Sequence, residues 1–428
     1  MNKLTKRSWL SFIIIGLVGQ FAWTIENMYF NVFLYKTIST EPGYIASMVA
    51  ASAVVATLTT LVMGAVSDRI GRRKPFICAG YILWGLSTMA FGMISVENAG
   101  RWFPTANAVS AAAVMVIVMD CVMTFFGSSA NDAAFNAYVT DSTSKSNRGK
   151  VEAVLAVLPL MSMLVIFGAF DKMTQASRWR EFFLIFGIAV TLTGIASIWL
   201  LKESAVQKKK TPFFSDLVYG FRFSVMHNNK KLYTALFAFL VFSIAVQVFM
   251  PYLIIYMQYY LKIDAYAIVL GVVLITASAV SVIGGREIDK VGKLRFAIPA
   301  SGVMFAGLVA MFFARGFAAV IIAGIIMMSG YMLVTAALSA TIRDYTPLDK
   351  VGHFQGIRMI FAVMLPMIVG PFIGSAVIKG SSSTYEELGA VKNVPTPYIF
   401  LASAVVLMLV AVPIIKLRRG EKNENSVG

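Results

Sequence analysis

The chain has 428 residues, of which 58% are hydrophobic and only 14% are charged. Water-soluble domains carry about 25% charged residues, so a mean hydropathy of +0.76 excludes an ordinary soluble protein. The net charge of +16 does not require a nucleic-acid partner, because basic loops of a membrane protein face the anionic inner leaflet. The composition predicts a polytopic protein whose partner is the lipid bilayer.

A helix needs about 20 mostly apolar residues to cross a bilayer. The first such stretch lacks a small-residue cleavage site after its charged start, so we expect it to be retained as a membrane helix rather than removed as a signal peptide. Twelve stretches qualify, and the predicted spans are 9–35, 43–66, 75–95, 107–139, 151–170, 182–201, 232–260, 266–285, 294–314, 317–341, 353–378 and 397–416.

The longest charged connection separates the sixth and seventh spans. We expect an N-terminal six-helix bundle over 1–201, a cytoplasmic central loop over 202–231, a C-terminal six-helix bundle over 232–416 and a cytoplasmic tail over 417–428. If the N-terminus is cytoplasmic, 28 of the 37 Lys and Arg residues fall on inner segments and nine on outer ones. This bias predicts a multi-pass protein of the cell membrane, a monomer with both termini in the cytoplasm.

Two short signatures recur in the two halves. "GAVSDRIGRRK" (64–74) follows the second span, and "GREIDKVGK" (285–293) follows the eighth. After the fourth and tenth spans, Asp141 and Asp344 each precede a glycine by eight residues. The chain therefore reads as a duplicated six-helix unit, a pattern common in secondary transporters, whose substrate site lies near the membrane midplane between the repeats.

The signatures have a physical reading. We expect Gly64 and Gly285 to permit close helix approach, Gly71 and Gly292 to permit tight turns, and Asp68 to pair with a basic residue as a latch. The alternative is that these basic loops only anchor the topology. The residues assigned to gating or structure are Gly64, Asp68, Arg69, Gly71, Arg72, Arg73, Asp141, Arg148, Glu152, Gly285, Asp289, Gly292, Asp344 and Arg358.

"GAVSDRIGRRK" resembles the signature loop of the major facilitator superfamily, and the degenerate second copy is typical of it. The resemblance covers essentially the whole chain and implies the major facilitator fold, an all-α membrane protein with twelve transmembrane helices in two pseudo-symmetric six-helix bundles. It further implies alternating access around a central site.

A closer resemblance is carried by "QFAWTIE", "DRIGRRKPFI" and "AFNAYVTD". They are similar to the Q-F-x-W-A-x-[QE], D-R-x-G-R-R-R-P-F-I and R-A-L-L-A-D motifs of sucrose–proton symporters, which stand with or near the glycoside–pentoside–hexuronide:cation symporters. Asn136 replaces the arginine of the third motif, which weakens any transfer of roles in that helix. The melibiose permease branch uses acidic residues on helix 2 for sodium. The second span here has none, so the resemblance favours protons over Na⁺.

The first span carries an unusual carboxyl group, Glu26, at membrane depth, where ionisable residues are rare and usually functional. Gln20, Trp23, Asn27 and Asn31 follow helical spacing beside it. An aromatic ring next to amide and carboxylate groups suits a sugar, because the ring stacks on the C–H face while polar groups meet the hydroxyls. The plainer interpretation is a helix–helix hydrogen-bond network.

The fourth span carries two further acidic residues, Asp120 near its middle and Asp132 twelve residues on. We rank the proton-coupling candidates Asp132, Glu26, Asp120, because Asp132 lies in a polar cluster with Asn131. Asp132 is equally open to a structural bond with Arg358, and the structural interpretation is favoured for Asp120.

Further substrate-binding candidates lie in the second half. They are Gln247, Tyr252 and Tyr256 in the seventh span and Tyr331 in the tenth. Pro251 predicts a kink in the seventh helix. The tyrosines fit an interfacial aromatic belt as well as a substrate wall.

The sequence carries no P-loop, no catalytic motif and no metal-ligand spacing. We therefore expect a transporter rather than an enzyme, with no cofactor. The expected substrate is a sugar or glycoside, and the expected coupling ion is H⁺. The alternatives are a drug or metabolite exporter working as a proton antiporter, and a non-transporting sensor on the same scaffold.

Overall fold

Twelve helices in the described residues are long and apolar enough to cross a membrane, and each coincides with one of the twelve predicted spans. The computed structural model describes residues 4–143, 148–202, 220–347, 351–381, 384–387 and 390–425. At some positions within these ranges it describes the backbone alone. The predicted all-α membrane fold is confirmed. Contacts divide the chain into two compact units, one of Met1–Thr40 and Ala51–Thr211, the other of Glu41–Ala50 and Pro212–Gly428.

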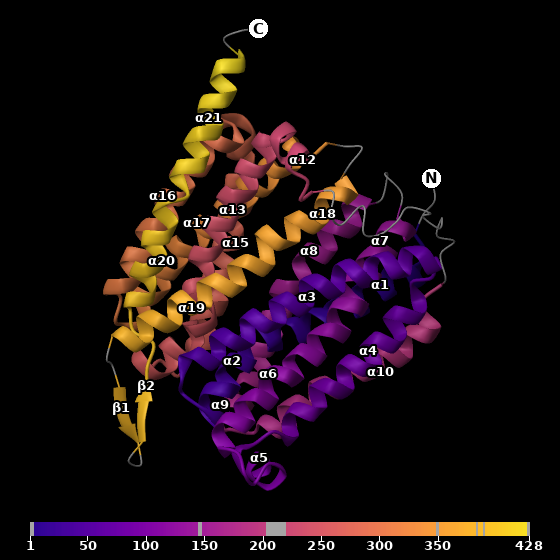
Figure 1. Ribbon diagram of the computed structural model, residues 1–428, viewed down its shortest axis with the longest axis vertical. Helices are drawn as coiled ribbons and strands as arrows, with labels where there is room; N and C mark the ends of the chain where they lie inside the picture. The colour runs from indigo at the N-terminus through magenta and orange to yellow at the C-terminus, as the bar shows by residue number, and fades with distance from the viewer. Residues whose placement is uncertain are drawn as a thin grey trace. The chain divides into compact units, whose positions relative to one another are not determined.

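The first six spans are built from long α-helices (Figure 1), which are interrupted by short π or 3₁₀ turns named η. Their bounds are α1 Lys6–Thr24, η1 Ile25–Tyr29, α2 Phe30–Phe33, η2 Leu34–Ile38, α3 Pro42–Ile70, α4 Lys74–Ala90, η3 Phe91–Met93, α5 Val96–Trp102, α6 Ala108–Gly127, η4 Ser128–Phe135, α7 Asn136–Ser142, α8 Arg148–Val165, η5 Ile166–Phe170, α9 Asp171–Gln175 and α10 Trp179–Leu200.

The last six spans follow the same plan. Their bounds are α12 Phe223–Asn228, α13 Lys230–Phe249, η6 Met250–Tyr252, α14 Leu253–Ile255, η7 Tyr256–Tyr260, α15 Tyr266–Val291, α16 Lys293–Phe313, α17 Phe317–Tyr345, α18 Val351–Met359, η9 Ile360–Met364, α19 Leu365–Gly380, α20 Tyr398–Met408 and α21 Ala411–Asn425. Pro251 lies in the 3₁₀ turn that ends α13, as expected for a residue that cannot donate the helical hydrogen bond.

A short β-hairpin that the sequence did not predict lies between α19 and α20 (Figure 1). Its strands are β1 Thr384–Glu387 and β2 Ala390–Asn393, which pair antiparallel with Thr384 opposite Asn393. Two four-residue strands are too short to give a clear alternation of polar and apolar residues.

The fourth span shows how sequence sets the orientation of a helix. Val114, Val118 and Val122 of α6 repeat every four residues and are exposed, whereas Asp120 and Thr124 are buried on the other side. Because lipid replaces water around a membrane protein, the apolar stripe is the lipid-facing side and the polar stripe faces protein. This rotation brings the carboxyl group of Asp120 into the first unit.

Small residues let neighbouring helices approach closely. In the first unit α4 and α10 lie side by side (Figure 1), and a Cβ on Gly85 would lie 2.4 Å from the carbonyl oxygen of Gly187. In the second unit, Gly307 of α16 lies against the backbone of Met327, and Gly330 of α17 lies against the backbone of Met304. Such backbone contacts are typical of helix packing in membranes.

Candidate functional site

Two buried carboxyl groups meet inside the first unit. Glu26, in the π turn η1, is 8% exposed, and its Oε1 accepts a hydrogen bond of 2.8 Å from the hydroxyl of Thr124 on α6. Its second oxygen, Oε2, is buried and has no hydrogen-bond partner. A carboxyl oxygen without a partner in an apolar interior is costly if the group is charged.

The second carboxyl group belongs to Asp120, which is 2% exposed. It precedes Thr124 by four residues and so lies on the same face of α6. Its carboxylate accepts a hydrogen bond from Ser52 on α3, while Oδ1 has no partner. The charge of Asp120 acts directly on Glu26. The structure therefore joins two acidic residues that sequence spacing alone placed on separate helices.

The pair has no cationic partner among the described residues. Among the residues that the structure describes, no Lys, Arg or His nitrogen lies within ion-pair distance of Glu26 or Asp120. Their only donors there are the hydroxyls of Thr124 and Ser52. Two ionised carboxylates buried together repel each other, so the arrangement is stable only when a proton or another cation neutralises it.

Asp132, the third acidic candidate, is less buried than Glu26 and Asp120. It lies in the π turn η4, is half-buried, and its Oδ2 accepts a hydrogen bond of 3.1 Å from the hydroxyl of Ser128. It therefore lacks the burial that distinguishes the Glu26–Asp120 pair.

Three predicted substrate residues occupy an accessible side of the first span. Gln20 and Trp23 are half-buried and Asn27 is exposed. The Trp23 ring packs against the buried Trp84 with centroids 5.0 Å apart, and Asn27 Nδ2 donates to the carbonyl oxygen of Trp23 at 2.8 Å. Exposed polar groups at membrane depth face water or protein rather than lipid, so this side of the span can receive a solute.

Two other residues predicted to bind substrate are buried and make packing contacts within the first unit. Asn131 is buried and donates to the hydroxyl of Tyr81 at 2.6 Å, and Tyr81 donates in turn to the carbonyl oxygen of Ile15. Its amide lies against Gly19, where any side chain would clash. Asn31 is 2% exposed and donates within its own helix. The sequence around an asparagine does not show whether its amide group binds a neighbouring helix or a ligand.

The substrate-binding candidates of the second unit also differ in how deeply they are buried. Tyr252 and Tyr256 are fully buried, and the Tyr252 hydroxyl donates to the carbonyl oxygen of Pro371 at 2.9 Å. Both tyrosine side chains are enclosed by protein in this structure rather than exposed on an open surface. Gln247 and Tyr331 remain half-buried.

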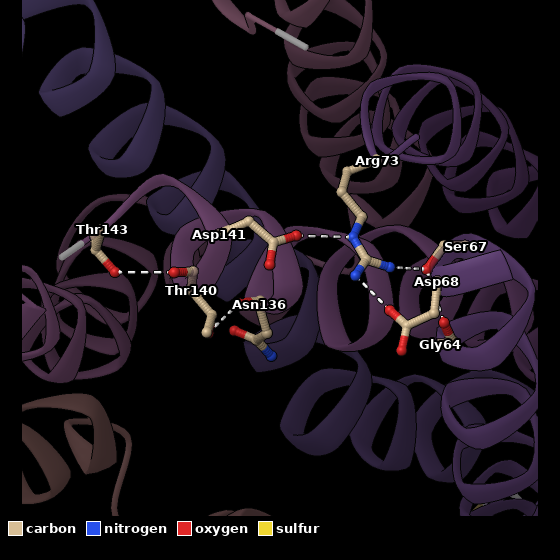
Figure 2. Close-up of polar contacts among 8 residues, drawn as sticks. All are labelled: Gly64, Ser67, Asp68, Arg73, Asn136, Thr140, Asp141 and Thr143. Carbon is tan, nitrogen blue, oxygen red and sulfur yellow. Dashed lines mark hydrogen bonds and ion pairs between the residues drawn. The ribbon is translucent and has the colours of Figure 1, made fainter. Parts of the chain in front are cut away.

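The first signature forms a charge cluster around Arg73 (Figure 2). Arg73 is only 4% exposed. Its guanidinium pairs with Asp68, donates to Asp141 Oδ2 at 3.1 Å and bonds the Ser67 hydroxyl. The cluster ties the end of α3 to the end of the fourth span, as the latch interpretation of Asp68 predicted.

The glycines of the signature have different roles. Gly71 has φ +73° and Gly292 has φ +95°, so both predicted tight turns are present. A Cβ on Gly64 would meet no atom within 4 Å, so the predicted close helix approach at Gly64 is wrong. The turn at Gly71 aims Arg73 back toward the end of α3.

The second signature is looser than the first. Lys293 pairs with Asp344, and their side chains are 29% and 54% exposed. Arg69, Arg72 and Arg358 are exposed. The side chains of four further predicted residues lie outside the described part of the structure: Arg148, Glu152, Gly285 and Asp289.

Comparisons with known proteins agree with this architecture. Solved structures with the same fold include a point mutant of the nucleoside transporter NupG (TM-score 0.73, 10% identity, covering 95% of this chain and 99% of that one). A bacterial homolog of the human lysosomal transporter Spinster gives 0.69 at 14% identity, covering 97% and 98%. The xylose transporter XylE from E. coli gives 0.68 at 12% identity, covering 95% and 96%.

Comparison with curated protein sequences gives no match. The family model of the Major Facilitator Superfamily matches residues 12–371 and 268–427, which together span almost all of the chain. The duplicated signature and the twelve spans are therefore those of a membrane transporter scaffold, and this chain belongs to the Major Facilitator Superfamily.

Proposed function

We propose that the protein is a secondary active transporter that moves a sugar or glycoside together with protons. The observation that carries the coupling is the buried pair of Glu26 and Asp120, which has two unpartnered oxygens and no described cation beside it. A site of this kind has to take up a positive charge before it can stay buried, and a proton is the smallest one. Release of that proton changes the free energy of the buried conformation, which is how a gradient can drive transport.

The substrate class rests on a different set of side chains. Gln20, Trp23 and Asn27 combine an indole ring with two amides on the accessible side of the first span, and such a surface suits the alternating C–H and O–H groups of a sugar. Two of the similar structures are transporters of nucleosides and of xylose. We place the protein in the cell membrane with cytoplasmic termini, following the distribution of basic residues, and we propose that it works as a monomer.

The second candidate is a proton-coupled exporter of drugs or metabolites. An aromatic surface beside a carboxyl group also suits a lipophilic cation. The two candidates differ in direction and in ligand. Counterflow of a labelled sugar favours the symporter, and gradient-driven efflux of a cationic dye favours the exporter.

The test is uptake into proteoliposomes. A panel of labelled mono- and disaccharides and nucleosides is offered with and without an imposed inward proton gradient, to the wild type, Glu26→Gln and Asp120→Asn. We expect the gradient to stimulate uptake of one substrate at least tenfold and both variants to lose that stimulation. Asp132→Asn is the comparison variant, because it neutralises the third acidic candidate and shows whether the coupling is confined to the pair. Absence of uptake of every sugar and nucleoside under every gradient would sink the symporter proposal.

A further inference from the structure

The two copies of the signature differ at one position that shapes the space around them. Counted from Gly71 and Gly292, the place of Arg73 in the first copy is taken by Leu294 in the second. Arg73 fills the gap between its helix ends with a guanidinium held by two carboxylates. Leu294 is shorter, uncharged and buried, so the corresponding region of the second unit is left open.

A cavity of about 360 Å³ lies in that region, at the turn between α15 and α16 and beside the end of α17. Its polar lining includes Lys293, Arg295, Thr341, Asp344 and Tyr345. The Thr341 hydroxyl already donates to the carbonyl oxygen of Ala337. The groups left to meet a ligand are therefore mainly the charged ones.

The charges of this cavity do not cancel. Lys293 is paired with Asp344, whereas Arg295 is exposed and makes no ion pair with any described side chain. Among the described lining side chains one positive charge is therefore in excess, on a guanidinium group whose planar fork matches phosphate geometry. The backbone N–H groups of the first turn of α16 add weaker positive potential.

The cavity also lies at the depth of lipid headgroups. The apolar helix α15 ends at Val291 and the next membrane helix, α16, begins at Lys293 with basic residues in its first turn, which is the composition of a turn at the membrane–water interface. Val291, which lines the cavity, is 46% exposed, and Ile283, two turns earlier on the same helix, is 70% exposed. A basic cavity beside an apolar, lipid-facing surface fits a molecule with a phosphate head and acyl chains.

We propose that the cavity at the α15–α16 turn binds the phosphate group of an anionic phospholipid. Arg295 holds the phosphate, and the exposed valine and isoleucine side chains of α15 contact the acyl chains. Asp344 weakens phosphate binding, because it forms an ion pair with the ammonium group of Lys293 and adds a negative charge to the cavity. This inference does not depend on which solute the protein transports.

The test is a lipid titration of the full-length protein in detergent, followed by native mass spectrometry. The probes are phosphatidylglycerol, phosphatidylcholine and, separately, inorganic phosphate. We expect one phosphatidylglycerol to bind more tightly than phosphatidylcholine, and Arg295→Gln to weaken that binding about fivefold, as the loss of one basic residue near a membrane surface implies. Lys230→Gln, an exposed basic residue at the start of α13, is the matched control and is expected to change nothing.

The Asp344→Asn variant is the most decisive test, because the proposal predicts tighter lipid binding rather than weaker. It frees Lys293 and removes a negative charge, so phosphatidylglycerol binding should become several-fold tighter, a gain that misfolding cannot produce. Weaker binding in Asp344→Asn, equal losses in Arg295→Gln and Lys230→Gln, or equal binding of both lipids would each overturn the proposal. Competition by millimolar inorganic phosphate without lipid selectivity would assign the cavity to a soluble phosphate and overturn the lipid assignment.

Discussion

Replacing Arg73 by methionine removes the charge at the centre of the cluster while keeping most of the side-chain volume. Arg73 is 4% exposed and bonds Asp68, Asp141 and Ser67. A hydrogen bond to a charged group contributes about 1.5–3 kcal/mol, which gives about 3–6 kcal/mol for the two carboxylates. Because those carboxylates are 28% and 27% exposed, water recovers part of the loss, and we expect a destabilisation of about 3 kcal/mol.

The assay is thermal unfolding in detergent, followed by tryptophan fluorescence. At about 2–4 °C per kcal/mol for a unit of this size, Arg73→Met should lower the unfolding midpoint by about 6–12 °C. All proteins are heated at one scan rate, because membrane proteins often unfold irreversibly. Arg72→Met is the matched control, since Arg72 is the adjacent residue and is exposed, and its midpoint should shift by no more than about 2 °C.

A double-mutant cycle with Asp141→Asn isolates the Arg73–Asp141 contact. We expect the two substitutions together to cost less than the sum of the single ones, with a coupling of about 1–2 kcal/mol. Equal midpoints for Arg73→Met and Arg72→Met, or strict additivity in the cycle, would refute the view that buried charge-assisted bonds hold this cluster together.

Three smaller predictions follow from the same reasoning. Lys293→Met should cost less than about 1 kcal/mol, and the loss should shrink further in high salt, because its ion pair is largely exposed; a loss as large as that of Arg73→Met would contradict this. Gly85→Ala should destabilise by about 2 kcal/mol, because the new Cβ meets backbone, whereas Gly168→Ala, with open space around it, should be nearly neutral in the same thermal assay. Tyr252→Phe should destabilise the protein by about 1 kcal/mol, because its hydrogen bond to a backbone carbonyl is lost. Substrate affinity in a binding titration should not change, and a large loss of affinity would indicate that Tyr252 binds the substrate.

The spans and the signature turns could be predicted from the sequence because they depend on local chemistry. Hydropathy over about 20 residues locates a membrane helix wherever it packs. Gly71 and Gly292 recur at matching places in the two repeats, and both adopt positive φ. Asp68 and Arg73 are only five residues apart, so their pairing is close to a local property as well.

The pairing of Glu26 with Asp120 could not be predicted, because it depends on how two helices are rotated toward each other. The π turn at Ile25–Tyr29 adds to this, since it breaks the 3.6-residue period from which a helical face is inferred. Thr124, one turn after Asp120 on the same helix face, is the one signal in the sequence that points to a shared polar site.

Asn131 and Tyr252 show an ambiguity that the sequence leaves open. Both are polar residues inside membrane spans, which by default mark a functional site. Each instead donates a hydrogen bond to a neighbouring helix, a role that polar residues also take in membrane helix packing. Only the positions of the acceptors, Tyr81 and Pro371, distinguish the two roles, and those depend on tertiary structure.

The most direct test of the central claim is to measure proton movement with substrate. Vesicles containing the protein, without an imposed gradient, are given the substrate found in the uptake panel, and the pH of a weakly buffered medium is recorded. If Glu26 and Asp120 together carry the coupling proton, the wild type and Asp132→Asn will make the medium more alkaline, while Glu26→Gln and Asp120→Asn will not. Alkalinisation that persists in both Glu26→Gln and Asp120→Asn, or that is lost only in Asp132→Asn, would contradict the account.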